Sequence, residues 1–427
     1  MNFEYFFASR ITFKTDRKAS TLVVWLSITS IALAVATMEI ALSFVQGFET
    51  EIQRKVIGFS AHIQIGNYLR EFDTEVQPLP KNDSSINRIR NIPNVSTISP
   101  FVHHWSVIKS PGGWEGVLMK GVDESYDWRF FATVLKEGQI PDYSHTDSSK
   151  AGQILISRKQ ARRLNLAVGD KARLLFLPQP IRRRPVEVAG IYETGMEEFD
   201  NSLIICDMRM LQDIWKWNEN QVSGFEVNLK DITRSYDLAL QPTFPFIGID
   251  TLDPLIDANR LVRENTPFYF GTVPITDLFS EIFAWLRLQH QNVWVILVLM
   301  MIVAIINMTS VVLILIIERI RTVGILKSMG LPAFRVRRLF VWYAFFLILI
   351  GVILGNILGI SLLAIQDTWG VLRVNQEDYF IERVPVAWVW NRFLWVNVGV
   401  IAVCTLFMFI PTIVINRISP LKAIRFE

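Results

Sequence analysis

Residues that could bind a metal or attack a substrate are sparse in this 427-residue sequence. Five histidines are scattered, and only His103 and His104 are adjacent. A metal pair and two surface histidines in a strand or loop are both open interpretations, and the second is the commoner arrangement. The two cysteines, Cys206 and Cys404, lie in a soluble-type region and in an apolar run, which argues against a disulfide between them. No zinc or redox framework follows from these spacings.

Catalytic motifs are missing from the sequence as well. It has no GxxxxGK[ST] phosphate loop, no HExxH and no GxSxG. Two adjacent carboxylate pairs lie in polar segments typical of a solvated surface, Glu197-Glu198 and Glu377-Asp378. The chain is therefore predicted to be non-catalytic, with no catalytic residue, metal or cofactor of its own, and not to hydrolyse ATP itself.

The most distinctive chemistry is cationic, in the stretch ERIRTVGILKSMGLPAFRVRRLF from Glu318 to Phe340. Its only acid is Glu318, against six cations: Arg319, Arg321, Lys327, Arg335, Arg337 and Arg338. Positive charge beside a membrane span marks the cytoplasmic side, so this loop is predicted to lie in the cytosol. Gly330 has the position of a helix C-terminus, and Pro332 that of the first turn of the next helix. A short helix here suits docking onto a cytosolic partner, whereas a basic hairpin that only fixes topology is the alternative.

The elements around this stretch are apolar, in a chain of 51% hydrophobic and 19% charged residues, which is typical of a partly membrane-embedded protein. Runs long enough to cross a bilayer occur at residues 21–44, 293–317, 339–365 and 393–415. The third run carries a glycine ladder that allows close helix packing, Gly351, Gly355 and Gly359. Glu39, an ionisable residue in the first run, is interpreted as a wetted interfacial carboxylate, with cavity lining as the second interpretation.

Between the first two spans lie roughly two hundred residues of soluble-domain composition. Helical stripes at 45–57 and 278–286 predict that the two flanking spans continue as stalks. Seven β-rich runs predict strands, at Ala61–Ile65, Gly116–Lys120, Gln153–Ile156, Lys171–Leu177, Val186–Ile191, Leu203–Cys206 and Gly224–Leu229. Helices are predicted at Ser157–Leu166, Asp207–Trp217 and Asp231–Leu240. The result is an α+β domain, predicted in two parts with a break within 142–151.

The predicted fold class is an α-helical membrane protein with four transmembrane helices and a large α+β extracytoplasmic (periplasmic) domain inserted between helices 1 and 2. Both termini and the basic loop are predicted in the cytosol, and the insert and the 366–392 loop outside. A formal net charge of +3 is too small to argue for nucleic acid. The predicted segments are the N-terminal amphipathic segment (1–20), the first span with its stalk (21–57), the outer domain (58–275), the second stalk and span (276–317), the coupling loop (318–338), the third span (339–365), the outer loop (366–392), the fourth span (393–415) and the tail (416–427).

This layout, with one span, a large outer domain and three further spans, resembles the ABC-transporter permeases shared by macrolide exporters, the cell-division permease and the lipoprotein-releasing permeases. ERIRTVGILKSMG, residues 318–330, resembles the coupling segment of that family, although family members commonly have an acid where Thr322 stands. SPLKAIRFE, residues 419–427, resembles the family's ending. The matching coupling residues are Glu318, Arg319, Gly324, Leu326, Lys327 and Gly330.

Four further segments are similar to the lipoprotein-releasing branch (LolC/LolE type): residues 46–65, 152–170, 188–200 and 378–386. Ser60 and Ala61 replace the proline that the branch usually has before His62. One subtype of the branch has a longer loop that hooks a soluble carrier. The loop 176–185 is short here, which departs from that subtype. The candidate carrier contacts are nevertheless the three arginines Arg182, Arg183 and Arg184, for which a solvated basic loop is the alternative.

The resemblance implies a bacterial inner-membrane permease that works with two copies of a cytosolic ABC ATPase, which binds ATP and Mg²⁺, and with a second permease, identical or homologous. It further implies lipoprotein cargo, membrane lipids around the spans and a periplasmic lipoprotein carrier. The implied substrate groove is lined by Met38, Glu39, Ala41, Leu42, Val45, Phe48, Met301 and Ile305, each of which could equally pack against neighbours or face lipid. One alternative keeps the architecture with another cargo, as an efflux permease for antibiotics, toxins or peptides. The other belongs to a different class, a transmembrane regulator of a cell-wall hydrolase that transports nothing.

Overall fold

The structure is a computed structural model that describes residues 18–67, 77–143, 152–176, 181–230, 254–375 and 381–417. The chain divides into two compact units. The helical unit comprises Met1–Phe48, Leu288–Leu372 and Arg383–Glu427, and the sheet unit comprises Glu49–Arg287 and Arg373–Glu382. Two long helices, α2 (Lys18–Ser60) and α11 (Ser280–Glu318), contribute residues to both units. The predicted N-terminal amphipathic segment lies almost wholly outside the described residues.

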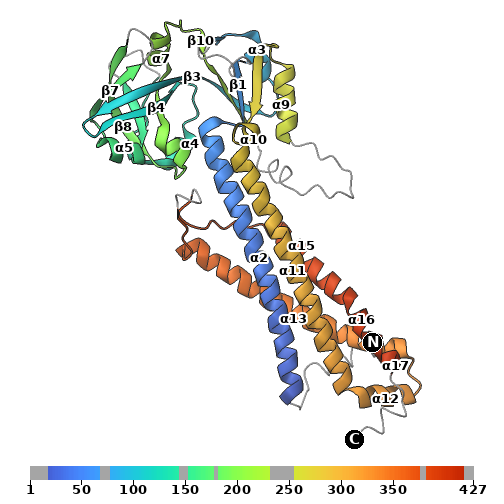
Figure 1. Cartoon of the computed structure of the whole chain (residues 1–427). Coiled ribbons are helices and arrows are strands. Elements are labelled where there is room, and N and C mark those ends of the chain that lie inside the picture. Colours follow the sequence, from blue (N-terminus) through green and yellow to red (C-terminus); the bar gives the residue numbers. More distant parts are fainter. Residues whose placement is uncertain are drawn as a thin grey trace. The chain divides into compact units, whose positions relative to one another are not determined.

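Four helices are long and apolar enough to cross a membrane: Val24–Ser60, Ser280–Glu318, Ala333–Trp369 and Trp390–Thr412. Each contains one of the four predicted apolar runs almost entirely, which confirms those runs. The first two extend well past their apolar runs, as the amphipathic stripes predict. The fourth is less regular, because Pro411 has no N–H for the helix ladder. The remaining elements of this part of the chain are α12 (Ile320–Ser328), α13 (Ala333–Trp369), α15 (Trp390–Phe407), α16 (Phe409–Thr412) and α17 (Val414–Arg417) (Figure 1).

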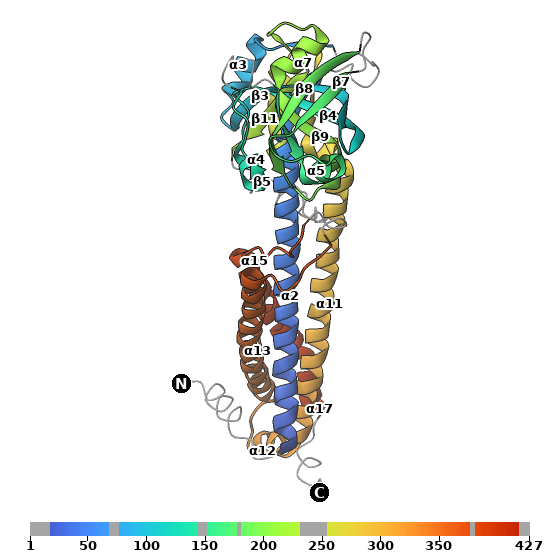
Figure 2. The same cartoon turned by 90° about the vertical axis from the view of Figure 1, so that its left-hand side faces the viewer.

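The predicted glycine ladder of α13 is confirmed as a close-packing surface against α2, beside which it runs in Figure 2. A Cβ atom on Gly351 would lie 2.8 Å from the side chain of Ile31, and one on Gly355 would lie 2.8 Å from the carbonyl oxygen of Ala32. A larger residue at either position would push the helices apart. Around this contact the helices share one apolar core that includes Ile31, Ala344 and Val400.

The sheet unit is built on a ten-stranded mixed sheet with the order β12-β1-β11-β3-β4-β9-β6-β8-β5, to which β7 adds by pairing with β3 and β8. Its strands are β1 (Ile63–Asn67), β3 (Val95–Ser110), β4 (Gly113–Val122), β5 (Leu135–Gly138), β6 (Gln153–Ser157), β7 (Lys171–Phe176), β8 (Arg182–Tyr192), β9 (Leu203–Asp207), β11 (Gly224–Leu229) and β12 (Phe270–Pro274). A separate small ladder joins β2 (Leu79–Pro80) to β10 (Gln221–Val222).

All seven predicted strands are confirmed, with boundaries that differ by a few residues. The prediction misses the longest strand, β3, because Phe101 and Val102 are both buried and Pro100 interrupts the run, so no clean alternation shows. The main sheet takes strands from both sides of the segment 142–151, and the two-part division of the domain stays a prediction.

Short helices cover this sheet: α3 (Ser84–Arg90), α4 (Arg129–Val134), α5 (Arg158–Leu164), α6 (Glu197–Ser202), α7 (Met208–Trp215), α9 (Pro254–Glu264) and α10 (Ile275–Leu278) (Figure 1). Two of them confirm predicted helices. α5 begins with a capping box in which Ser157 and Gln160 satisfy each other's backbone N–H groups, and the carboxylate of Asp207 caps α7. The third predicted helix, Asp231–Leu240, lies outside the described residues.

Helix α2 is followed by an unusual residue, Ala61, whose φ of 55° is left-handed. Its N–H donates to the carbonyl of Ile57 at 2.7 Å, which closes the last turn. Proline has neither an N–H nor access to a positive φ. The structure therefore explains why this chain does not have the branch's usual proline before His62.

Candidate functional site

The short helix α12 ends in the geometry that its sequence predicts. Gly330 has a φ of +84°, its N–H donates to the carbonyl of Lys327, and the N–H of Leu331 donates to the carbonyl of Leu326, each at 3.1 Å. This pair of bonds is a Schellman motif, in which glycine supplies the left-handed residue at little cost. Pro332 then caps α13. Glycine is required here for its backbone conformation alone, because no atom lies within 4 Å of the place of a Cβ.

Helix α12 packs one face against the other helices of its unit and leaves the opposite face exposed. Val323 and Gly324 are buried, and the Lys327 ammonium donates to the carbonyl of Ile415 at 2.8 Å, which ties the helix to α17. The opposite face exposes Ile325 and Met329, the latter 79% accessible. Two exposed apolar residues one helical turn apart are a candidate contact for another protein.

The structure thus divides the six predicted coupling residues by position. Gly324 is buried, Leu326 and Lys327 face the bundle, and Gly330 ends the helix. Glu318 and Arg319 lie at the junction of α11 and α12. Motif matching missed the outward residues Ile325 and Met329, although their i, i+4 spacing with Arg321 was visible in the sequence.

The predicted groove residues do not all lie on a surface of the single chain. Met38 and Glu39 are 1% and 0% exposed, and Met38 belongs to the apolar core, against which Met301 and Ile305 pack. The remaining predicted residues are half-buried: Ala41, Leu42, Val45 and Phe48. Whether these side chains meet a substrate stays a prediction.

The expectation of a wetted interfacial carboxylate is wrong for Glu39, which is 0% exposed and has neighbours on α13 and α15. Its Oε1 accepts a hydrogen bond from Asn397 at 3.3 Å, and Asn397 and Asn356 exchange two amide hydrogen bonds at 2.9 Å. Its Oε2 lies against Gly359, where a Cβ would be 2.6 Å away. These residues link α2, α13 and α15 as a polar cluster, and the two asparagines are a feature that the sequence interpretation missed.

In the sheet unit, the end of α2 is anchored by side-chain packing. Phe59 stacks on Phe199 with ring centroids 4.2 Å apart, and meets Phe131 edge-on at 5.5 Å. The preceding Gly58 leaves room for Phe130, whose ring lies 2.2 Å from the place of a Cβ. The ammonium group of Lys55 donates to the carbonyl of Thr194 at 2.6 Å. The last turns of α2 are therefore locked into this aromatic cluster.

A buried ion pair strengthens the same anchor. Lys120 on β4 donates to the carbonyl of Phe59 at 2.5 Å and pairs with Glu226 on β11 at 2.7 Å. The two side chains are only 2% and 4% exposed. Burial raises the pKa of Glu226, and the Lys120 ammonium opposes that rise. A cation at the carbonyl end of α2 also complements the helix dipole.

His62, directly after α2, makes the anchor sensitive to acid. Its Nδ1 accepts from the N–H of Leu229 at 3.2 Å, and burial lowers its pKa from 6.5 to about 4. Between pH 6.5 and pH 4, the His62 imidazole therefore binds a proton in the unfolded chain but stays neutral in the folded chain. We expect stability to be unaffected by this residue above pH 6.5 and to fall by about 3 kcal/mol as the pH drops to 4. Chemical denaturation of wild type and His62→Gln at pH 7 and pH 4.5 measures this, and equal pH dependence of the two proteins would contradict it.

The three arginines near the 176–185 loop do not form one surface. Arg182 donates to the backbone carbonyls of Asp213 at 2.7 Å and Ile214 at 3.1 Å, and Arg184 pairs with the carboxylate of Asp213 at 3.2 Å. Strand alternation points Arg183 to the other face, where it is exposed. Of the three predicted carrier contacts, Arg183 is the exposed residue.

The adjacent histidines and the two cysteines are the other candidate reactive residues of the sequence. His103 and His104 alternate across the sheet, and His104 is buried against Phe176 and Trp215, so the expectation of two surface histidines is wrong for His104. Within the described ranges, no group of three or more His, Cys, Asp and Glu residues could hold a metal ion. Cys206 and Cys404 are both free and buried.

Two family models match the chain. The FtsX-like permease C-terminal model matches residues 294–420, and the MacB-like periplasmic core domain model matches residues 24–237, which is half of the chain. Two solved structures are also similar: the periplasmic region of MacB from Actinobacillus actinomycetemcomitans (11% identity, 52% of this chain, 91% of that chain, TM-score 0.34) and the extracellular domain of the transporter YknZ from Gram-positive bacteria (14%, 49%, 98%, TM-score 0.31).

Relatives of similar length carry the name of the lipoprotein-releasing system. LolC of Xylella fastidiosa is 23% identical over 425 residues, covering 94% of this chain and 93% of that protein. LolE of Haemophilus influenzae is 22% identical over 413 residues, covering 92% of each, and LolC of Neisseria meningitidis is 24% identical over 429 residues, covering 94% and 93%. The family matches, together with the four long helices and the α/β unit, show that this chain belongs to the FtsX-like and MacB-like ABC-transporter permeases.

Proposed function

We propose that this chain is the permease subunit of an ABC transporter that releases lipoproteins from the outer leaflet of the bacterial inner membrane. The observation that carries the proposal is the full-length similarity to LolC and LolE proteins, which extends over both units of the chain. Shared membrane topology alone would fit many transporters. Similarity through the sheet unit as well as the helices favours a shared cargo class.

Energy for this work has to come from a partner, because the sequence has no phosphate-binding loop. Each buried methylene of a lipid anchor contributes about 0.8 kcal/mol, so one sixteen-carbon chain is held by about 12 kcal/mol. A cytosolic ABC ATPase, in two copies and with its own ATP and Mg²⁺, would supply that energy. Its docking surface on this chain is the exposed face of α12, with Ile325 and Met329 at its centre.

The stroke would travel along α2 and α11, each of which is one continuous helix with residues in both units. Continuity matters because a helix without a break transmits displacement, whereas a loop absorbs it. The anchor at Phe59 and Lys120 makes the sheet unit follow the end of α2. A second permease, identical or homologous, would complete the groove between the helices. The cytosolic side is assigned from the basic residues around α12.

Delivery to a periplasmic lipoprotein carrier is the last step of the proposal. Arg183 is the contact that we propose on this chain, since Arg182 and Arg184 hold α7 instead. An exposed guanidinium binds carboxylates of an acidic partner well.

Proteoliposomes that contain the purified complex and an acylated lipoprotein test the function. We expect lipoprotein to appear in the soluble fraction only with ATP, carrier and this chain present together. ATP-dependent movement of an antibiotic or peptide without lipoprotein release would replace this proposal with efflux. Recovery of a cell-wall hydrolase, and no lipoprotein, among the proteins that co-purify in mild detergent would identify a regulator.

A further inference from the structure

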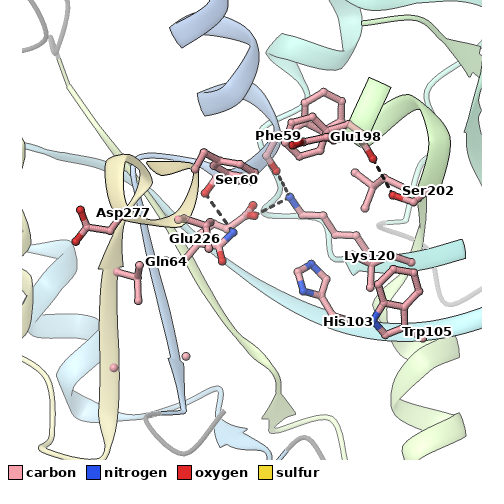
Figure 3. A pocket seen from close by; sticks show the side chains of 18 of the residues that line it. Phe59, Ser60, Gln64, His103, Trp105, Lys120, Glu198, Ser202, Glu226 and Asp277 are labelled. Carbon is pink, nitrogen blue, oxygen red and sulfur yellow. Dashed lines mark hydrogen bonds and ion pairs between the residues drawn. The ribbon is translucent and has the colours of Figure 1, made fainter. Parts of the chain in front are cut away.

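A cavity of about 750 Å³ opens on one face of the sheet unit, beside the anchor of α2 (Figure 3). Its floor consists of neighbouring strands, because the pairing register places Gln64 of β1 opposite both Val273 of β12 and Glu226 of β11. Farther along, His103 of β3 lies opposite Lys120 of β4. All five of these residues line the cavity.

The walls of the cavity are largely aromatic. Phe59 of α2 stacks on Phe199 of α6, and Phe199 meets Phe279 with ring centroids 5.4 Å apart. Trp105 adds a ring that is 64% exposed, although the side chain sits on a sheet floor. Aromatic faces left open in this way bind apolar groups and also cations.

The charged groups of the lining favour a cationic ligand. Among the described lining residues Lys120 is the only lysine or arginine, and that ammonium is already held by the Phe59 carbonyl, by Glu226 and, at 3.4 Å, by the Tyr126 hydroxyl. A phosphate group would therefore find no free cation among the described lining residues. Glu198, by contrast, is an exposed carboxylate on the rim, and no described residue forms an ion pair with it.

We propose that this cavity binds an extended peptide segment with a basic side chain next to an apolar one, supplied by the polypeptide of the cargo. The basic group lies between Trp105 and Glu198, and the apolar side chain packs on the rings of Phe59 and Phe199. The identity of the peptide as cargo rests on the proposed function, whereas the chemistry of the site does not. A peptide bound here contacts the last turn of α2 and the residues that lead into α11, so it is in direct contact with the ends of both long helices.

The test uses the full chain in detergent micelles and a synthetic peptide of alternating lysine and phenylalanine with a neutral fluorophore. We expect saturable binding, weakened about tenfold by Trp105→Ala and about threefold by Glu198→Gln. Trp114→Ala is the matched control for the first variant, because Trp114 is 63% exposed on the adjacent strand and does not line the cavity. Glu124→Gln, at another exposed acid, is the control for the second.

Three outcomes would overturn the site: no saturable binding, equal loss in the control variants, or equal binding of a peptide with glutamate in place of lysine. Preferential binding of glycerophosphoethanolamine would assign the cavity to a lipid headgroup and overturn the peptide proposal. These binding measurements need neither ATP nor the release of a lipoprotein. Peptide binding without lipoprotein release by the complete complex would therefore count against the cargo assignment and the proposed function while leaving the site in place.

Discussion

Replacing Lys120 with methionine should destabilise the sheet unit by about 3–5 kcal/mol, because the Glu226 carboxylate would be left buried without its counterion. The same change removes the cation at the carbonyl of Phe59, where α2 ends. Since a whole domain is stable by only about 5–15 kcal/mol, a loss of this size leaves little margin. Denaturant unfolding of the full chain in micelles, followed by hydrogen exchange in β4 and β11, measures the effect.

Two further variants separate the ion pair from ordinary charge removal. Lys81→Met breaks an ion pair with Asp123 that is partly exposed, and should cost less than about 1 kcal/mol. Lys120→Met combined with Glu226→Leu removes both buried charges and should recover most of the loss. If Lys120→Met cost no more than Lys81→Met, the buried pair would not be what holds the end of α2.

Placing aspartate at both Ile325 and Met329 should abolish ATP-driven release. Both side chains are exposed, so the change leaves the fold intact and alters only the proposed docking face of α12. Desolvating two carboxylates in an apolar contact weakens the contact by several kcal/mol. We expect the ATPase to co-purify at least about tenfold less with this variant. Quantitative immunoblotting of the purified complex measures this.

The control for that experiment is Ile256→Asp, at an exposed apolar residue on α9 of the sheet unit. It should leave ATPase binding unchanged. Lys327→Met and Gly330→Val act by another route, since they free α12 from Ile415 and strain its C-terminus. These two should retain the ATPase but uncouple hydrolysis from release. Normal ATPase recovery with the double aspartate variant would show that the partner docks elsewhere.

Much of the fold could be predicted because single periodicities dominate in each segment. Four long apolar runs, the seven strands and the end of α12 at Gly330 all depend on local patterns, and all are confirmed. Strand β3 was missed since its alternation is broken at Phe101 and Val102, which are buried on both faces of a central strand. Local pattern cannot report where a strand lies within its sheet.

The site was harder to predict because its contacts join distant parts of the chain. Lys120 and Glu226 are separated by more than a hundred positions, and neither is distinctive in the sequence. Motif resemblance found α12 but selected residues that hold it in place, such as Gly324 and Lys327, over those that point outward. Arg182, Arg183 and Arg184 lie on strand β8, so alternation along the strand decides that Arg183 is the exposed one. An interpretation of the segment as a loop gives all three arginines the same exposure.

The Glu39 cluster also constrains how the protein is made. Asn397, the residue that hydrogen-bonds the carboxyl group, follows it by 358 positions, so α2 enters the bilayer long before α15 has been synthesised. An acidic side chain is costly in a lone span, by up to about 2.5–3.5 kcal/mol at the centre of the helix and by less toward its end, where Glu39 lies. We therefore expect newly synthesised α2 to need a protected or hydrated environment until α15 has been made. Truncated chains that end before the fourth span should be degraded by quality-control proteases.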